Sequence, residues 1–164
     1  MRTVVVVSGP VNAGKTTVGR ALARVIEGAT FIDGDDHDAP DDASLHVRIE
    51  AALQRLCGEI VATPSHCLVI AYPLRDQDHE RLLRAAKTGE ARLLVVTLAP
   101  PLEVTLSDRG NRKLNDGEQA RIREMYAEGY NHQAFSGLTV AGVPSVDLAV
   151  GQILAWLSAP PTAP

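Results

Sequence analysis

Apolar residues in this chain come in short runs, separated by longer segments in which they recur every three or four positions. The first run, residues 4–7, consists of four valines, and further runs follow at 29–32, 67–71, 92–98 and 138–141. A run that is apolar at every position is typical of a strand buried on both faces of a parallel sheet. The pattern therefore predicts five strands.

The segments between these runs have the period of amphipathic helices. We expect helices at residues 14–26, 45–61, 78–86, 102–107, 118–128 and 146–157. Strands that alternate with helices indicate βαβ crossovers, so the predicted fold is α/β, a three-layer sandwich in which a five-stranded parallel sheet carries helices on both faces. We expect a single domain over residues 1–158 and a disordered, proline-rich tail over 159–164.

Composition narrows the possible partners. The 164 residues carry a net charge of −4, which argues against a protein that binds nucleic-acid backbones. The spacing of Cys57 and Cys67 is not that of a disulfide framework or of a zinc site. We therefore expect the protein to reside in the reducing cytoplasm. No apolar run approaches the roughly 20 residues of a membrane span, and the N-terminus does not resemble a signal peptide. We therefore expect a cytoplasmic monomer or homodimer with no membrane or nucleic-acid partner.

The negative charge is concentrated in one place. Six aspartates (Asp33, Asp35, Asp36, Asp38, Asp41 and Asp42) fall within ten residues that contain no Lys or Arg. Because the whole chain carries −4, the rest of it carries +2. The protein therefore has one acidic loop on an otherwise slightly basic chain.

Residues 9–16, Gly-Pro-Val-Asn-Ala-Gly-Lys-Thr, match the phosphate-binding pattern GxxxxGK[ST]. In this motif backbone N–H groups surround phosphate oxygens, the lysine neutralises the β- and γ-phosphates, and the hydroxyl binds Mg²⁺. The required strand before it and helix after it are both predicted. We therefore expect ATP and Mg²⁺ as cofactors, with nucleotide contacts from Gly9, Asn12, Ala13, Gly14, Lys15, Thr16 and Thr17.

The position of the next acidic residues selects among phosphate-loop proteins. The chain lacks the Asn-Lys-x-Asp guanine reader of GTPases, and neither the third nor the fourth strand ends in an acid as in motor ATPases. Asp33 and Asp35 instead follow the second strand, beside the phosphate loop at the carboxyl edge of the sheet. One of these carboxylates can hold Mg²⁺ through water while the other accepts a proton from an attacking hydroxyl, and the alternative for both is a solvated turn.

Acidic residues in this position are the arrangement that a small-molecule kinase requires. Such an enzyme also needs a mobile basic lid over the transferring phosphoryl group. Residues 107–117 contain three positive charges and two glycines, Gly110 and Gly117, and we predict that Arg109 and Arg112, with Lys15, are catalytic. Tyr72 and Arg75 follow the third strand at the same edge and are candidates for substrate contacts. The alternatives are core packing for Tyr72 and a helix-start surface position for Arg75.

With these residues in place, the chain resembles the small P-loop kinases, a group that includes shikimate kinase and chloramphenicol phosphotransferase, and is most similar to gluconate kinase. Residues 31–37 (FIDGDDH) look like the strand-two motif of that family, and residues 72–76 (YPLRD) with 81–84 (RLLR) resemble its next two segments. The resemblance extends to about residue 128. It implies a five-stranded parallel sheet. It also implies that Lys15 and Thr16 meet the phosphates and Mg²⁺, that Asp33 lies near the metal, and that Asp35 binds the acceptor and is the candidate base, with Arg75 at the substrate and Arg109 and Arg112 in the lid.

The chain also departs from gluconate kinase. Residues 37–44 lack the lysine-methionine and proline-tryptophan-leucine stretch of its substrate-binding part, and Pro73 replaces a small residue. We predict an ATP- and Mg²⁺-dependent kinase that phosphorylates a hydroxyl of a small polar metabolite or natural product. Shikimate-, adenylylsulfate- and antibiotic-type kinases stay open as alternatives. A further alternative is an ATP-binding regulatory or toxin-type protein that acts on a macromolecule.

Overall fold

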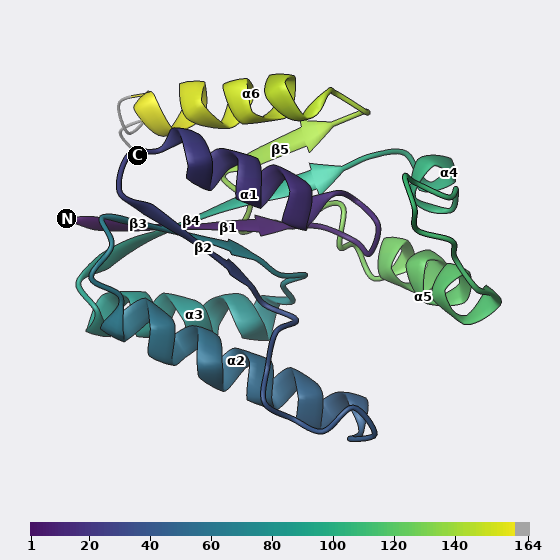
Figure 1. Ribbon diagram of the computed structural model, residues 1–164, viewed down its shortest axis with the longest axis horizontal. Helices are drawn as coiled ribbons and strands as arrows, with labels where there is room; N and C mark the ends of the chain where they lie inside the picture. Colours follow the sequence, from purple (N-terminus) through teal and green to yellow (C-terminus); the bar gives the residue numbers. More distant parts are fainter. Residues whose placement is uncertain (160–164) are drawn as a thin grey trace.

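The computed structural model describes residues 1–159, which form five parallel strands flanked by helices (Figure 1). The strands are β1 (Arg2–Ser8), β2 (Ala29–Asp33), β3 (Cys67–Ala71), β4 (Ala91–Ala99) and β5 (Leu138–Ala141). The helices are α1 (Lys15–Val25), α2 (Leu45–Ala62), α3 (Asp76–Thr88), α4 (Leu102–Thr105), α5 (Asp116–Ala127) and α6 (Val146–Ser158). The predicted α/β fold with its five-stranded parallel sheet is confirmed.

The sheet order is β2-β3-β1-β4-β5, with β1 at the centre. The chain leaves β1 toward one edge through α1 and later crosses back over β1 between β3 and β4. This reversal opens a crevice at the carboxyl end of β1, where ligands bind in open α/β sheets.

Two hydrophobic cores lie on opposite faces of the sheet. Val4 and Val6 of β1 pack with α2 and α3 on one face, while Val5 and Val7 pack with α1 and α6 on the other. Figure 1 shows these two helical layers above and below the sheet. Because successive side chains of a strand alternate between faces, all four valines are buried, which explains the uninterrupted apolar run.

Two helices begin two residues earlier than the apolar pattern predicts, because polar residues cap them. α5 begins at Asp116, since the side chain of Asn115 accepts a hydrogen bond from the backbone N–H of Glu118 and that of Glu118 accepts one from Asn115. α3 begins at Asp76, where the Asp78 carboxylate accepts a hydrogen bond from the backbone N–H of Arg75.

Helices α4 and α5 lie beyond the carboxyl end of the sheet, where Figure 1 shows them apart from both helical layers. None of the helices within residues 1–159 combines the length and the apolar character of a membrane span. Apart from Ala159, the predicted tail lies outside the described residues.

The first glycine of the phosphate-binding pattern is required by packing. Gly9 has a φ of +136°, and a Cβ there would lie 2.5 Å from the backbone oxygen of Leu98. We expect Gly9→Ala to lower the free energy of unfolding by about 3 kcal/mol, through backbone strain and the displacement of β4. Urea unfolding measures this change.

Gly151→Ala is the matched control, since a Cβ at Gly151 in α6 meets no atom within 4 Å. It should raise stability by about 0.5–1 kcal/mol. Equal stability of the two variants would show that the approach of Gly9 to β4 does not constrain the fold.

Candidate active site

Residues 9–16 form a loop from β1 into α1 whose backbone groups face the crevice. Asn12 and Gly14 have positive φ angles of 62° and 96°, which turn the chain back on itself. Gly14 caps α1 without a side-chain hydrogen bond, and the first turn of the helix has no acidic residue. The N–H groups of this turn are therefore available to phosphate oxygens, and the helix dipole favours an anion there.

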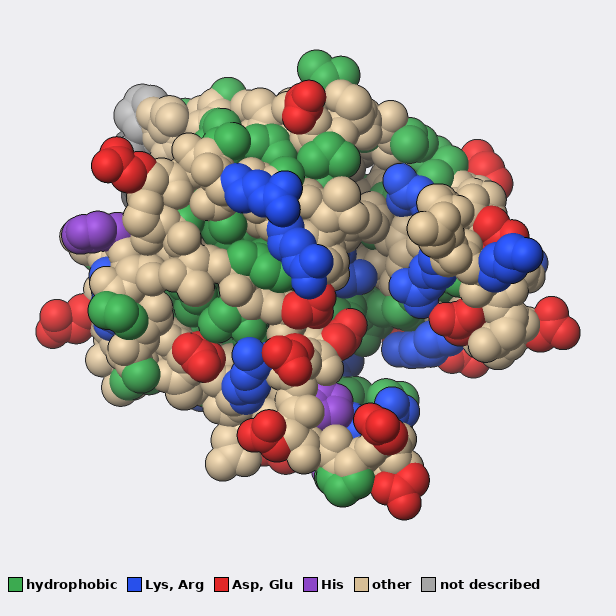
Figure 2. Space-filling model, in the orientation of Figure 1, with side chains coloured by type: hydrophobic (Ala, Val, Ile, Leu, Met, Phe, Trp, Pro, Cys, Tyr) green, Lys and Arg blue, Asp and Glu red, His purple; other side chains and the backbone are tan. Residues whose placement is uncertain are grey.

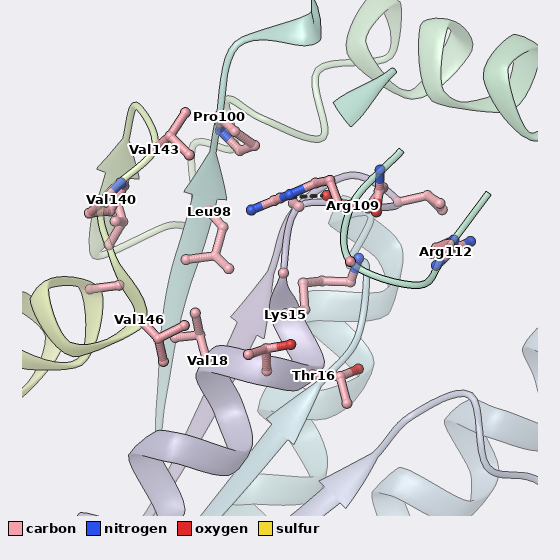
Figure 3. Close-up of a pocket in the computed structure, with 18 of the residues that line it drawn as sticks. Lys15, Thr16, Val18, Leu98, Pro100, Arg109, Arg112, Val140, Val143 and Val146 are labelled. Carbon is pink, nitrogen blue, oxygen red and sulfur yellow. Dashed lines mark hydrogen bonds between the residues drawn. The ribbon is translucent and has the colours of Figure 1, made fainter. Parts of the chain in front are cut away.

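A cavity of about 550 Å³ lies over this loop (Figure 3). Its polar end contains Lys15, Thr16, Thr17, Asp35, Arg109 and Arg112, so residues predicted to bind nucleotide, acceptor and transferring phosphate share one space. Asn12, Ala13 and Gly14 also line it. Of the predicted nucleotide contacts, only Gly9 lies outside the lining, packed against β4.

The opposite end of the cavity is apolar and was missed by the sequence reasoning. Its wall consists of Leu98, Pro100, Val140, Val143, Pro144, Val146 and Ala149, from β4, β5 and the connection into α6. Figure 3 shows several of these side chains around the space beside the phosphate loop. A flat apolar space next to a phosphate site has the chemistry to hold a nucleotide base. The signal in the sequence was the Gly142–Pro144 turn directly after the last predicted strand.

Lys15 is a partly buried cation of this site. Its Nζ donates a hydrogen bond to the carbonyl oxygen of Pro10 at 2.7 Å. The pKa of Lys15 is lowered to about 8, mainly by burial; Asp35 and Asp33 oppose the shift and Arg112 adds to it. The charge of Lys15 is thus only partly compensated, and a phosphate anion would stabilise it.

Thr16 and Asp33 form a pair of hard oxygen donors beside Lys15. The hydroxyl of Thr16 donates to Oδ2 of Asp33 at 3.0 Å, and Oδ1 of Asp33 accepts from the backbone N–H of Asp35 at 3.2 Å. Within residues 1–159 no three His, Cys, Asp or Glu side chains converge on one point. The pair therefore suits Mg²⁺, which takes few protein ligands and completes its octahedron with phosphate oxygens and water.

Gly34 and Tyr72 lock the turn that carries the two aspartates. The N–H of Gly34 donates to the carbonyl of Ala71 at 2.9 Å, and a Cβ on Gly34 would lie 2.4 Å from Cδ2 of Tyr72. Tyr72 is only 5% exposed, and burial raises the pKa of its phenol. Packing is therefore the role that the structure gives Tyr72, while its predicted substrate contact stays a prediction.

Arg55 of α2 holds the same turn from another direction and was also missed. Its Nη1 donates to the carbonyl of Asp33 at 3.2 Å and to the carbonyl of Asp36, and its Nη2 lies 3.6 Å from the Asp36 carboxylate. The signal in the sequence is weak, because Arg55 is one of two arginines in the helix and lies beside its apolar stripe.

Arg75 lies on a different cavity from Lys15 and Asp35. Its Nε and Nη2 each donate at 2.8 Å to the carboxylate of Asp78, which is 2% exposed. The pair lines a space of about 260 Å³ between α2 and α3. The predicted substrate contact of Arg75 stays a prediction, and the structure adds a bidentate ion pair that occupies one edge of its guanidinium.

The predicted lid residues stand at the mouth of the large cavity. Nη1 of Arg109 donates to the backbone oxygen of Asn12 at 2.9 Å, and Nη2 of Arg112 lies 3.0 Å from Glu118. Figure 2 shows a hollow beside the part of the chain that holds α4 and α5, with Lys and Arg side chains gathered on that part. Both arginines line the cavity, as predicted for groups that meet phosphate.

Solved structures share this fold at low sequence identity. A gluconokinase from Sinorhizobium meliloti 1021 is 20% identical, with a TM-score of 0.76 over 96% of this chain and 94% of that chain. Shikimate kinase from Acinetobacter baumannii is also 20% identical, with a TM-score of 0.69 over 96% and 93% of the two chains. The tunicamycin resistance protein of Deinococcus radiodurans is 18% identical, with a TM-score of 0.65 over the full length of both.

The chain has the fold of these small P-loop kinases. The resemblance stated from the sequence is confirmed at the level of structure. No protein-family model matches the chain, and no curated protein sequence matches it.

The lowered pKa of Lys15 predicts a pH dependence of nucleotide binding. With a pKa of about 8, Lys15 is mostly charged at pH 7 and mostly neutral at pH 9. Phosphates stabilise the charged form, so binding takes up a proton above pH 8 and affinity falls as pH rises. We expect the dissociation constant for ADP, measured by calorimetry without divalent metal, to rise about eightfold from pH 7.5 to 9.

Lys15→Arg is the control, because a guanidinium stays charged throughout this range. Its pH profile should be flat, whatever its affinity. A flat profile for the unaltered protein would contradict the lowered pKa.

The ion pair of half-buried Arg75 with buried Asp78 predicts a stability effect. Asp78→Asn removes a carboxylate that accepts hydrogen bonds from Nε, Nη2 and the backbone N–H of Arg75. We expect the free energy of unfolding in urea to fall by about 2–3 kcal/mol.

Glu50→Gln breaks the comparable pair with Arg81, in which the Glu50 side chain is 53% exposed. It should lower stability much less than Asp78→Asn does, because solvent screens an exposed pair. Unchanged stability of the Asp78 variant would show that the ion pair does not hold the start of α3.

Proposed function

We propose that this protein is an ATP- and Mg²⁺-dependent kinase that transfers a phosphoryl group to a hydroxyl of a small polar molecule. One observation carries the proposal: Asp35 lines the same cavity as the phosphate loop, and its carboxylate has no ion-pair or hydrogen-bond partner among residues 1–159. A free carboxylate beside a phosphate site is suited to accept a proton from an attacking hydroxyl.

The cations of the cavity bind and stabilise the phosphates. Lys15 and the N–H groups of the first turn of α1 hold the β- and γ-phosphates, and Arg109 and Arg112 approach from the lid. Base and ribose extend toward the apolar wall formed by β4, β5 and the start of α6. This placement directs the terminal phosphate toward Asp35.

Thr16 and Asp33 would hold Mg²⁺ between the phosphate oxygens and the sheet. When bound, the ion neutralises charge that develops on the β- and γ-phosphates. The hydrogen bond from Thr16 to Asp33 keeps the two oxygens 3.0 Å apart, and Arg55 and Gly34 fix the turn that carries Asp33. The Thr16 hydroxyl and the Asp33 carboxylate are thus positioned by contacts within the protein, before any ligand binds.

In the reaction, Asp35 orients the acceptor hydroxyl and takes its proton as the oxygen attacks the γ-phosphorus. The new oxygen–phosphorus bond forms as the bond to the β-phosphate oxygen breaks, and ADP leaves. Lys15, Arg109 and Arg112 stabilise the charge on the transferring group, and closure of the lid excludes water.

The structural neighbours support a small acceptor. They include a gluconokinase, a shikimate kinase and a sugar kinase, each superposing over 96% of this chain. The acceptor side here differs from the gluconate kinase pattern in residues 37–44. A screen should therefore include sugars, sugar acids, shikimate, aminocyclitols and adenylylsulfate.

The proposal predicts that Asp35→Asn abolishes phosphoryl transfer while leaving nucleotide binding nearly intact. We expect turnover to fall at least about 100-fold, the usual contribution of a general base, with less than about a threefold change in ADP affinity. ADP release is measured with the best acceptor of the screen, and ADP binding by calorimetry.

Asp41→Asn is the matched control, because Asp41 lies in the same acidic segment and does not line the cavity. It should leave turnover unchanged, whereas Lys15→Ala should abolish it. Intact nucleotide binding without turnover of any acceptor would favour the regulatory or toxin-type alternative. Full activity of the Asp35 variant would overturn the assigned base.

A further inference from the structure

Asn12 stands at the apex of the phosphate loop and reaches out of it. Its side-chain Nδ2 donates hydrogen bonds to the carbonyl oxygens of Thr105 at 2.9 Å and Ser107 at 3.1 Å. Thr105 is the last residue of α4, where carbonyls lack partners within the helix, and Ser107 lies two residues beyond it. The side-chain amide therefore satisfies the end of the helix that leads into the lid.

A return contact runs from the lid to the same residue. Nη1 of Arg109 donates to the backbone oxygen of Asn12 at 2.9 Å, the hydrogen bond drawn in Figure 3. Three hydrogen bonds thus join one residue of the phosphate loop to a segment more than 90 positions away in the sequence. Each segment therefore donates hydrogen bonds to the other: Asn12 donates to residues 105 and 107, which we call the root of the lid, and Arg109 of the lid donates to Asn12.

The backbone of Asn12 suits asparagine in particular. Its φ of 62° is left-handed, a conformation that asparagine and glycine adopt more readily than other residues. Only asparagine of these two also carries an NH₂ group whose two hydrogens can reach two carbonyls. An aspartate at this position would place a carboxylate oxygen against the carbonyl oxygens of Thr105 and Ser107, and none of these groups can donate a hydrogen bond.

We propose that Asn12 is a positioning residue that fixes the root of the lid to the phosphate loop, so that Arg109 and Arg112 stand over the phosphate site before nucleotide binds. Replacement of Asn12 frees the lid without removing any group assigned to contact the acceptor. The kinetic part of this inference rests on the proposed kinase function, whereas its structural part does not.

Limited trypsin digestion tests the structural part, because the lid itself contains Arg109, Arg112 and Lys113. Asn12→Gly keeps the backbone conformation and removes the amide. We expect cleavage after these three residues, assigned by mass spectrometry, to be about tenfold faster than in the unaltered protein, since two hydrogen bonds close the lid root. Asn12→Asp should be cut at least as fast.

Cleavage after Arg24 and Lys87, exposed residues of α1 and α3, reports on the rest of the fold and should not change. Asn131→Gly is the matched variant outside the phosphate loop and should leave lid cleavage unchanged. ADP with Mg²⁺ should slow lid cleavage in the unaltered protein and slow it less in the Asn12 variants.

Equal lid cleavage in all variants would overturn the inference. So would a loss of ADP affinity in Asn12→Gly with an unchanged lid, because Asn12 would then act only within the phosphate loop. With an active acceptor in hand, kcat of Asn12→Gly should fall about tenfold, more than KM for ATP rises. If no acceptor is turned over, the digestion still decides whether Asn12 holds the lid.

Discussion

The burial of β1 on both faces is the constraint on which the rest of the structure depends. Its four valines connect the two hydrophobic cores, and the end of the strand is fixed between β3 and β4. Ser8 accepts a hydrogen bond from the N–H of Leu74 at 3.0 Å, and Gly9 lies against the Leu98 carbonyl. The phosphate loop therefore starts from a position that the sheet determines, which is why its backbone can be preorganised for a ligand.

The cations of the protein are held in two different ways. Lys15 and Arg109 in the large cavity donate to neutral carbonyl oxygens, of Pro10 and Asn12, so their charge remains for a ligand. Arg75 outside that cavity is paired with a carboxylate, and its charge is largely compensated. Arg112 is intermediate, because it lines the cavity and also contacts Glu118.

The sequence predicted those features that depend on residues close together along the chain. Apolar runs predicted all five strands, and the spacing of Gly14, Lys15 and Thr16 predicted the groups that line the polar end of the cavity. Helix starts were less well predicted, because capping by Asn115 or by the Arg75–Asp78 pair does not alter the apolar period. Polar residues that act across long separations were also missed: Arg55 contacts a turn 19 to 22 positions away, a pairing that only the packing of α2 creates.

The apolar wall of the large cavity bears on how the protein would choose its phosphoryl donor. The side chains of this wall present hydrocarbon and no hydrogen-bonding group: Leu98, Pro100, Val140, Val143, Pro144, Val146 and Ala149. A base held there would be recognised by its shape and by backbone groups, because these side chains offer it no hydrogen-bond partner.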